Sequence, residues 1–237
     1  MTLLQTTGLS RSFGGLRAVS DVDFRLDAGE IRAVIGPNGA GKTTFVSLIS
    51  GRIAPSAGEI SFNGEDITEM PAFRRVQRGI AYTFQITSIY ANLTVAQNVA
   101  LAAQNVALAA HSTDTGTARA ILARVGLEGR EEQMAGTLSY GHQRLLEVAM
   151  GLALRPKLLI LDEPTQGLSD SEIEGFIALV KDVGRDSTVM LIEHNMGVVM
   201  QLAHRITVLD RGTILAEGTP AEISANPAVQ AAYLGTG

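Results

Sequence analysis

The sequence predicts an α/β fold in which helices cover a largely parallel β-sheet and a helical segment is inserted into that core. The apolar fraction is 46%, but aromatic residues make up only 5%. The core must therefore be built from aliphatic side chains, which suits a parallel sheet buried on both faces. Short β-prone runs alternate with helical stretches in residues 1–88 and again in 156–237. Residues 89–155 are instead rich in Ala, Leu, Gln and Glu at helical spacing.

Local patterns place the elements of both core segments in alternation. Strands are expected at 18–26, 30–35, 80–84, 158–161, 188–192, 206–210 and 213–217. Helices are expected at 42–50, 171–183 and 195–202. Asn63-Gly64 and Arg211-Gly212 predict tight hairpin turns. No linker or low-complexity segment divides the 237 residues, so we expect a single domain.

Charge and composition exclude several classes of protein. The net charge is −5, from 24 acidic and 19 basic residues, whereas a protein that binds duplex DNA usually has a basic face and a high pI. The absence of cysteine excludes disulfides and thiolate metal sites. No run of about 20 apolar residues indicates a membrane helix, so any attachment to a membrane must pass through a partner. For the basic cluster Arg74, Arg75 and Arg78, a solvated helix face is favoured over contact with lipid headgroups.

A phosphate-binding loop is indicated by Gly36-Pro37-Asn38-Gly39-Ala40-Gly41-Lys42-Thr43, which matches the pattern G-x-x-x-x-G-K-[ST]. Glycines let backbone N–H groups converge on phosphates without Cβ clashes, and the helix that follows presents its positive N-terminal end to the same point. We expect Lys42 to reach the β- and γ-phosphates of ATP, Thr43 to ligate Mg²⁺ and Thr44 to add a phosphate contact. The alternative is a chance match in a glycine-rich chain, but the strand before the motif and the helix after it are the context that such loops require.

Two carboxylates follow the apolar strand 158–161. Asp162 and Glu163 come directly after it, and the carboxyl ends of parallel strands face the ligand crevice of open α/β sheets. Asp162 is then placed to hold Mg²⁺ through water, and Glu163 to polarise the attacking water as general base. The alternative is a strand that ends in a solvated turn, and the phosphate loop elsewhere in the chain argues against it.

A third motif, Leu138-Ser139-Tyr140-Gly141-His142-Gln143, precedes the carboxylate strand by the length of a helix. It is similar to the Leu-Ser-Gly-Gly-Gln signature of the ABC ATPases. With the three motifs in this order, the sequence resembles that family over essentially its whole length. The resemblance implies a P-loop NTPase (RecA-like) core, residues 1–88 and 156–237, with an antiparallel β subdomain and an inserted α-helical signature subdomain, residues 89–155.

The same resemblance implies roles for three further residues. Gln85, after the predicted strand 80–84, matches a catalytic glutamine that senses Mg²⁺ as a metal ligand and links the core to the helical subdomain. His194 matches the switch histidine, which contacts the γ-phosphate and the attacking water. Phe13 matches the aromatic residue that stacks on adenine, and an aromatic residue of the core is the alternative.

The sequence departs from the family pattern at three positions. Tyr140 replaces a glycine, His142 replaces a glutamine, and Ser169 stands where many members have aspartate. Tyr140 and the Gly-Leu-Ser string that ends at Ser169 are similar to the Liv-type branch, which serves branched-chain amino-acid importers, as is the C-terminal stretch 226–235. We hypothesise that protonation of His142 alters the affinity between protomers, because histidine titrates near physiological pH.

Pairing of two such domains is a further implication of the resemblance. The phosphate loop of one protomer faces the signature residues 138–142 of the other across ATP, with Ser139 and Gly141 nearest the nucleotide. Hydrolysis is expected to proceed by direct attack of water on the γ-phosphorus, driven by positioning and charge stabilisation.

The predicted function is the ATP-binding and ATP-hydrolysing subunit of an importer for branched-chain or related amino acids or amides. Expected partners are a second ABC ATPase, identical or different, transmembrane permease subunits and, indirectly, a periplasmic or extracellular solute-binding protein, with no nucleic acid. Residues 85–93 are the candidate surface for the permease, with local packing as the alternative. The expected location is the cytoplasmic face of the inner or plasma membrane. Alternative functions are the ATPase of a lipid, lipopolysaccharide or export system, and a soluble ABC protein that acts on nucleic acid or ribosomes.

Overall fold

The chain is built around a six-stranded sheet in the computed structural model, which describes residues 1–83, 89–110 and 115–234. The strand order is β10-β9-β3-β8-β7-β6. The strands from β9 to β6 run parallel, and β10 pairs antiparallel with β9 at the edge. Their bounds are β3 (Ile31–Ile35), β6 (Ile80–Tyr82), β7 (Leu158–Asp162), β8 (Thr188–Ile192), β9 (Arg205–Asp210) and β10 (Thr213–Gly218).

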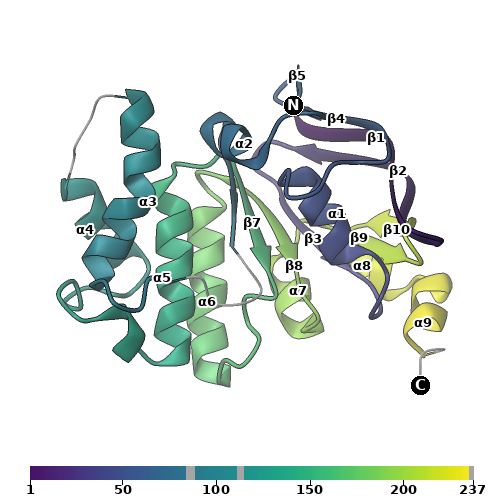
Figure 1. The fold of residues 1–237 in the computed structure, drawn as a ribbon. Helices are drawn as coiled ribbons and strands as arrows, with labels where there is room; N and C mark the ends of the chain where they lie inside the picture. The colour runs from purple at the N-terminus through teal and green to yellow at the C-terminus, as the bar shows by residue number, and fades with distance from the viewer. Residues whose placement is uncertain (84–88, 111–114, 235–237) are drawn as a thin grey trace.

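A second, antiparallel sheet lies beside the first (Figure 1). Both predicted hairpin turns are confirmed. Asn63 and Gly64 have φ of +52° and +80°, and Arg211 and Gly212 have φ of +47° and +82°, as two-residue hairpin turns require. The sheet has the order β2-β1-β4-β5 and consists of β1 (Thr2–Phe13), β2 (Leu16–Asp27), β4 (Ala57–Phe62) and β5 (Glu65–Asp66).

Helices cover both faces of the six-stranded sheet (Figure 1). The helix α1 (Lys42–Ile49) lies on the side of the antiparallel sheet, and α5 (Tyr140–Ala153) and α6 (Asp170–Val183) lie on the other side. Beyond α5 and farther from the sheet are α3 (Val95–Ala110) and α4 (Thr115–Arg124), which pack against α5. The other helices in the described ranges are α2 (Ala72–Arg78), the 3-10 turn η1 (Ala135–Thr137), α7 (Met196–Leu202), α8 (Pro220–Ser224) and α9 (Pro227–Leu234). None of the helices in these ranges is long and apolar enough to cross a bilayer.

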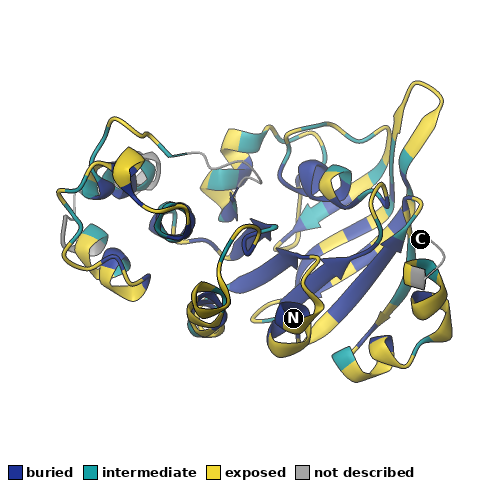
Figure 2. Cartoon of the chain, turned by 90° about the horizontal axis from the view of Figure 1, so that it is seen from below, coloured by how far each residue is buried: buried dark blue, intermediate teal, exposed yellow. Residues whose placement is uncertain are grey.

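The central strands are buried on both faces, as the dark band across Figure 2 shows. In β7, Leu158 and Ile160 pack with α1 and the antiparallel sheet, whereas Leu159 and Leu161 pack with α5 and α6. Burial of one such side chain stabilises the fold by about 1.5–3 kcal/mol. The predicted α/β class, with an antiparallel sheet and inserted helices, is confirmed.

Arg75 contradicts the solvated helix face that was expected for its basic cluster. The residue is only 1% exposed, and its guanidinium donates to the carbonyls of Leu48 at 2.7 Å and Ile49 at 2.8 Å. Burial lowers the pKa of Arg75 to about 10. Because the last carbonyls of a helix have no partner within it, Arg75 acts as a buried cap of α1. Arg78 does remain half-exposed and pairs with Glu65 at 2.7 Å.

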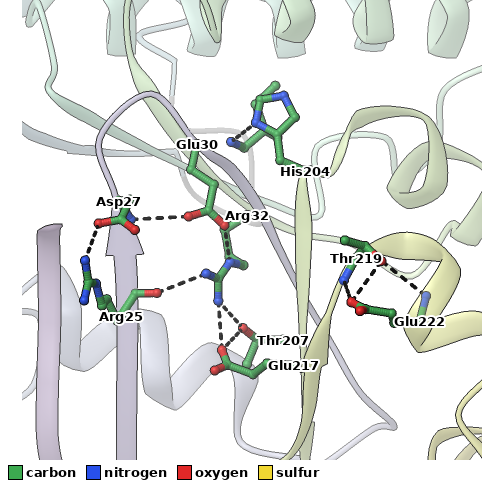
Figure 3. Close-up of polar contacts among 10 residues, drawn as sticks. Arg25, Asp27, Glu30, Arg32, His204, Thr207, Glu217, Thr219 and Glu222 are labelled. Carbon is green, nitrogen blue, oxygen red and sulfur yellow. Dashed lines mark hydrogen bonds and ion pairs between the residues drawn. The ribbon is translucent and has the colours of Figure 1, made fainter. Parts of the chain in front are cut away.

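Arg32 in β3 is the buried centre of a polar network (Figure 3). Its Nε donates to Glu30 at 2.6 Å, and its Nη1 donates to Glu217 at 2.8 Å and to Thr207 at 2.9 Å. Its Nη2 donates to the carbonyl of Arg25 in β2 at 3.1 Å. The guanidinium therefore ties β3, β9 and β10 to the antiparallel sheet.

Replacing Arg32 by methionine should lower the free energy of unfolding by about 3–5 kcal/mol, because the carboxylates around it would lose their cation. Equilibrium unfolding in urea measures the change. Arg25→Met is the control, because the Arg25 side chain is 64% exposed and its ion pair with Asp27 should contribute little. Equal losses in the two variants would contradict the role assigned to Arg32.

Candidate functional site

The phosphate loop, residues 36–41, joins the end of β3 to the start of α1. Gly36 and Gly41 have φ of +152° and +98°. A Cβ at Gly36 would lie 2.1 Å from the carbonyl oxygen of Leu209, and a Cβ at Gly41 would lie 2.2 Å from that of Ala18. Because both obstacles are backbone atoms, these two positions require glycine.

The turn between β9 and β10 is hydrogen-bonded to the phosphate loop. The N–H of Gly212 donates to the carbonyl of Ala40 at 3.0 Å, and the N–H of Ser20 donates to the carbonyl of Gly212 at 2.8 Å. Ser20 belongs to β2, so both sheets contribute to the position of the loop.

Lys42, the first residue of α1, turns its side chain back over the loop. Its Nζ donates to the carbonyls of Gly36 at 2.7 Å and Pro37 at 3.0 Å, and the residue is 6% exposed. Burial lowers the pKa of the ammonium, while the carboxylates of Glu163 and Asp162 favour its charged form. The structure therefore brings the predicted cation and both predicted carboxylates to one place.

Asp162 ends β7 and is almost fully buried. Its Oδ2 accepts a hydrogen bond from the hydroxyl of Tyr82, in the neighbouring β6, at 2.6 Å. Its Oδ1 has no hydrogen-bond partner among the described residues. Burial raises the pKa of Asp162, and the hydrogen bond from Tyr82 opposes that shift. A buried carboxylate oxygen without a donor fits a cation or a water bound to one.

The carboxylate of Asp162 and the hydroxyl of Thr43 are oxygen ligands of the kind that Mg²⁺ prefers. In the described part of the chain, no three His, Cys, Asp or Glu side chains form a metal-binding group. Magnesium is usually held by one or two carboxylates together with waters and substrate phosphates, so it needs no such group. Thr43 is exposed beside Lys42, and Gln85 lies outside the described residues.

Glu163 and His194 follow the neighbouring strands β7 and β8, and their side chains meet. The distance between Glu163 Oε1 and His194 Nε2 is 2.5 Å. Glu163 has φ of +49°, which is uncommon for a residue with a side chain and is concentrated at functional sites. Its N–H donates to the carbonyl of Ile192 at 2.9 Å, which fixes the start of this turn on β8.

The signature residues 138–142 lie at the start of α5, among the helices and away from the chain's own phosphate loop (Figure 1). Ser139 caps α5, and its Oγ lies 2.8 Å from Nδ1 of His142. The two predicted halves of the nucleotide site are therefore not brought together within one chain.

The signature fits closely against the start of α6. A Cβ at Gly141 would lie 2.1 Å from the carboxylate of Glu172, so a larger residue there would displace that carboxylate from its hydrogen bonds with Ser169. The ring of Tyr140 lies against Gly167, where a Cβ would come within 3.0 Å of it. The tyrosine that replaces a family glycine is thus accommodated by contact with another glycine.

Phe13 ends β1 and its ring remains 45% exposed. The guanidinium of Arg11 lies 4.8 Å from the ring centroid. This exposure argues against the alternative of a core aromatic residue.

Sequence reasoning did not single out Tyr82, which bonds to Asp162, or Glu193, a buried carboxylate beside His194. The available signals were the place of Tyr82 within the predicted strand 80–84 and that of Glu193 directly after the predicted strand 188–192.

Comparison with known proteins identifies the family. A family model described as ABC transporter matches residues 19–166, which contain the phosphate loop, the signature and both carboxylates. The chain belongs to the ABC transporter family. A second model, described as branched-chain amino acid ATP-binding cassette transporter, matches residues 213–237 of this cassette. The family and the ATPase class predicted from the motifs are confirmed.

Several relatives match the cassette along nearly its whole length. The high-affinity branched-chain amino acid transport ATP-binding protein BraF of Pseudomonas aeruginosa is 36% identical over 98% of each chain. LivG of Escherichia coli, which carries the same description, is 37% identical over 98% of each chain. Among solved structures, the ADP conformation of the ATP-binding cassette MJ1267 has a TM-score of 0.89 and 26% identity over 99% of each chain. A nucleotide-free cassette has a TM-score of 0.88 and 26% identity over 98% of this chain and 99% of that one.

Gly41→Ala should abolish nucleotide binding, because the added Cβ would collide with the carbonyl of Ala18 and displace the loop. Gly39→Ala is the matched control: its φ is +78°, but nothing lies within 4 Å of its Cβ position, so only left-handed strain of about 1–2 kcal/mol is added. Titration with a fluorescent ATP analogue measures both affinities, and thermal melting verifies folding. Equal affinities for the two variants would contradict the steric explanation.

Proposed function

We propose that this cassette is the ATP-hydrolysing subunit of an importer for branched-chain or related amino acids or amides. The supporting observation is its full-length similarity, at 36–37% identity, to ATP-binding proteins of branched-chain amino acid transport. The match of residues 213–237 to a model of the same transport class adds to it. The solute itself is not expected to touch this chain.

ATP binds at the phosphate loop in this proposal. The backbone N–H groups of residues 36–41 and the N-terminal end of α1 surround the phosphates. Lys42 exchanges the two loop carbonyls for phosphate oxygens, and Thr44 adds a further contact. The half-exposed ring of Phe13 stacks on the adenine.

Thr43, Gln85 and Asp162 are proposed to hold Mg²⁺ beside the phosphates. The supporting observation is the buried Oδ1 of Asp162, which has no donor among the described residues. When bound, the metal supplies positive charge that offsets the negative charge on the transferred phosphoryl group.

Hydrolysis in this proposal depends on the contact between Glu163 and His194. Glu163 accepts a proton from the attacking water as that water bonds to the γ-phosphorus. His194, 2.5 Å from Glu163 Oε1, orients that carboxylate and contacts the γ-phosphate. Lys42 stabilises the charge on the phosphate oxygens, and the products are ADP and phosphate.

A second cassette, identical or different, completes the site. Ser139 and the positive N-terminal end of α5 lie away from the chain's own loop (Figure 1), so we infer that they serve the nucleotide of a partner. A γ-phosphate gripped on one face by the loop gains a second set of donors on the other. ATP then favours the paired state by its higher affinity for that state.

The permease is proposed to dock in a groove between the core, residues 1–88 and 156–237, and the helical subdomain, residues 89–155. A cavity of about 300 Å³ is lined by residues from both, among them Tyr82, Tyr90 and Met150. Tyr90 is 54% exposed, whereas Ile89 packs against the hydrophobic core formed by the sheet and the helices on it. Local packing therefore accounts for Ile89 but not for Tyr90.

Docking to a permease would place the cassette at the cytoplasmic face of the inner or plasma membrane. A periplasmic or extracellular solute-binding protein would then act on it indirectly, through the permease. No nucleic acid enters this proposal.

The complete transporter, rebuilt in liposomes with its permease and binding protein, tests the proposal. ATP hydrolysis should rise when leucine, isoleucine, valine or a related amino acid or amide is added. Glu163→Gln should lower hydrolysis by at least about a hundredfold while ATP still binds, because the phosphate loop is unchanged. A transporter stimulated by none of these solutes would refute the substrate class, and an active Glu163→Gln variant would refute the general base.

The contact between Ser139 and His142 predicts a pH-dependent association of protomers. A neutral His142 ring can accept a hydrogen bond from the Ser139 hydroxyl at Nδ1. A protonated ring must instead donate there, which leaves the Ser139 hydroxyl free to donate to phosphate. ATP-dependent pairing should therefore strengthen as pH falls from 8 to 6, which sedimentation of the Glu163→Gln protein can measure. The same profile in a variant that also carries His142→Gln would contradict this prediction.

A further inference from the structure

Glu193 is a carboxylate buried between the ends of β7 and β8. It directly follows β8 and precedes His194, and it is 3% exposed. No basic side chain of the described residues forms an ion pair with it. Its charge is met instead by hydrogen-bond donors from two separate loops.

Each oxygen of Glu193 serves one of these loops. Oε1 accepts from both the N–H and the hydroxyl of Thr165, the N–H lying at 3.2 Å. Oε2 accepts from the N–H of His194 at 2.6 Å and from the N–H of Asn195 at 3.1 Å. One carboxylate thus joins the loop after β7 to the loop after β8.

The two loops that Glu193 joins carry the groups that meet above it. Thr165 lies two residues after Glu163 in a turn closed by the bond from the Gln166 N–H to the Glu163 carbonyl, at 3.2 Å. The side chains of Glu163 and His194 are 2.5 Å apart. Any relative movement of the two loops would change that distance.

We propose that Glu193 is a positioning residue that holds the Glu163 loop against the His194 loop and so fixes the contact between these two side chains. The inference rests on the proposed function, because the contact matters only if the site hydrolyses ATP. An ionised carboxylate can accept at both oxygens, whereas an amide has one acceptor oxygen and one donor nitrogen. Glutamine would therefore present its N–H groups to donors on one of the two loops.

Glu193→Gln in the assembled transporter should lower kcat by about tenfold or more, because misplacement by about 1 Å at a reacting centre can cost a hundredfold. The KM for ATP should change by less than about twofold, because Glu193 does not touch the phosphate loop. Glu30→Gln is the matched control: Glu30 is also a carboxylate with a mostly buried side chain, and it pairs with Arg32 away from the site. This control should leave kcat unchanged.

A double-mutant cycle separates positioning from general destabilisation. In a His194→Ala background, measured by single-turnover hydrolysis, Glu193→Gln should have no further effect, because the contact it fixes is already lost. Thr165→Val should reproduce part of the loss, and Thr165→Ser, which keeps the hydroxyl, should restore it.

The outcomes distinguish this inference from the function on which it rests. A wild-type transporter that does not hydrolyse ATP would refute the proposed function. A wild type that hydrolyses ATP, with Glu193→Gln equally active or with the same loss in both backgrounds, would refute only the positioning role. Should Glu193→Gln fail to fold, the comparison of Thr165→Val with Thr165→Ser decides the matter.

Discussion

The parallel pairing of β8 with its two neighbours determines how the proposed catalytic groups meet. Ile192, near the end of β8, pairs with Asp162 of β7 on one side and with Val34 of β3 on the other. The turn that begins at Glu163 follows β7, the loop that contains His194 follows β8, and the phosphate loop follows β3. A shift of one residue in either pairing would turn the side chains of a strand to the opposite face. Burial of β3, β7 and β8 on both faces opposes such a shift.

The parts of the site that sequence predicts are those whose physical requirements are local. The phosphate loop needs glycines within six consecutive residues, and β7 is a continuous apolar run that ends in Asp162. The contacts that sequence could not predict join distant segments. Tyr82 and Asp162 are 80 positions apart, and Arg75 caps a helix 26 positions earlier. No local pattern distinguishes a buried Arg75 from its exposed neighbours, because the carbonyls that bind it come from another element.

The unusual residues of the signature are accommodated by the structure around them. Tyr140 finds space because Gly167 opposite it has no side chain. His142 forms its contact with Ser139, the residue that caps α5, within the first turn of that helix. Gly141 differs, because a Cβ there would push the Glu172 carboxylate away from Ser169, and there this chain keeps the family residue. This chain therefore departs from the family signature at Tyr140 and His142, where the neighbouring residues accommodate a different side chain.

The position of Lys42 bears on which groups supply affinity for phosphate. Its ammonium already donates to two loop carbonyls at 2.7 Å and 3.0 Å. A phosphate would replace these acceptors, so the gain is the difference between charge-assisted bonds to phosphate and the bonds given up. The two carbonyls would then need water or another donor. In the proposed site, direct affinity would therefore come largely from the loop N–H groups and the end of α1, and Lys42 would offset part of the phosphate charge.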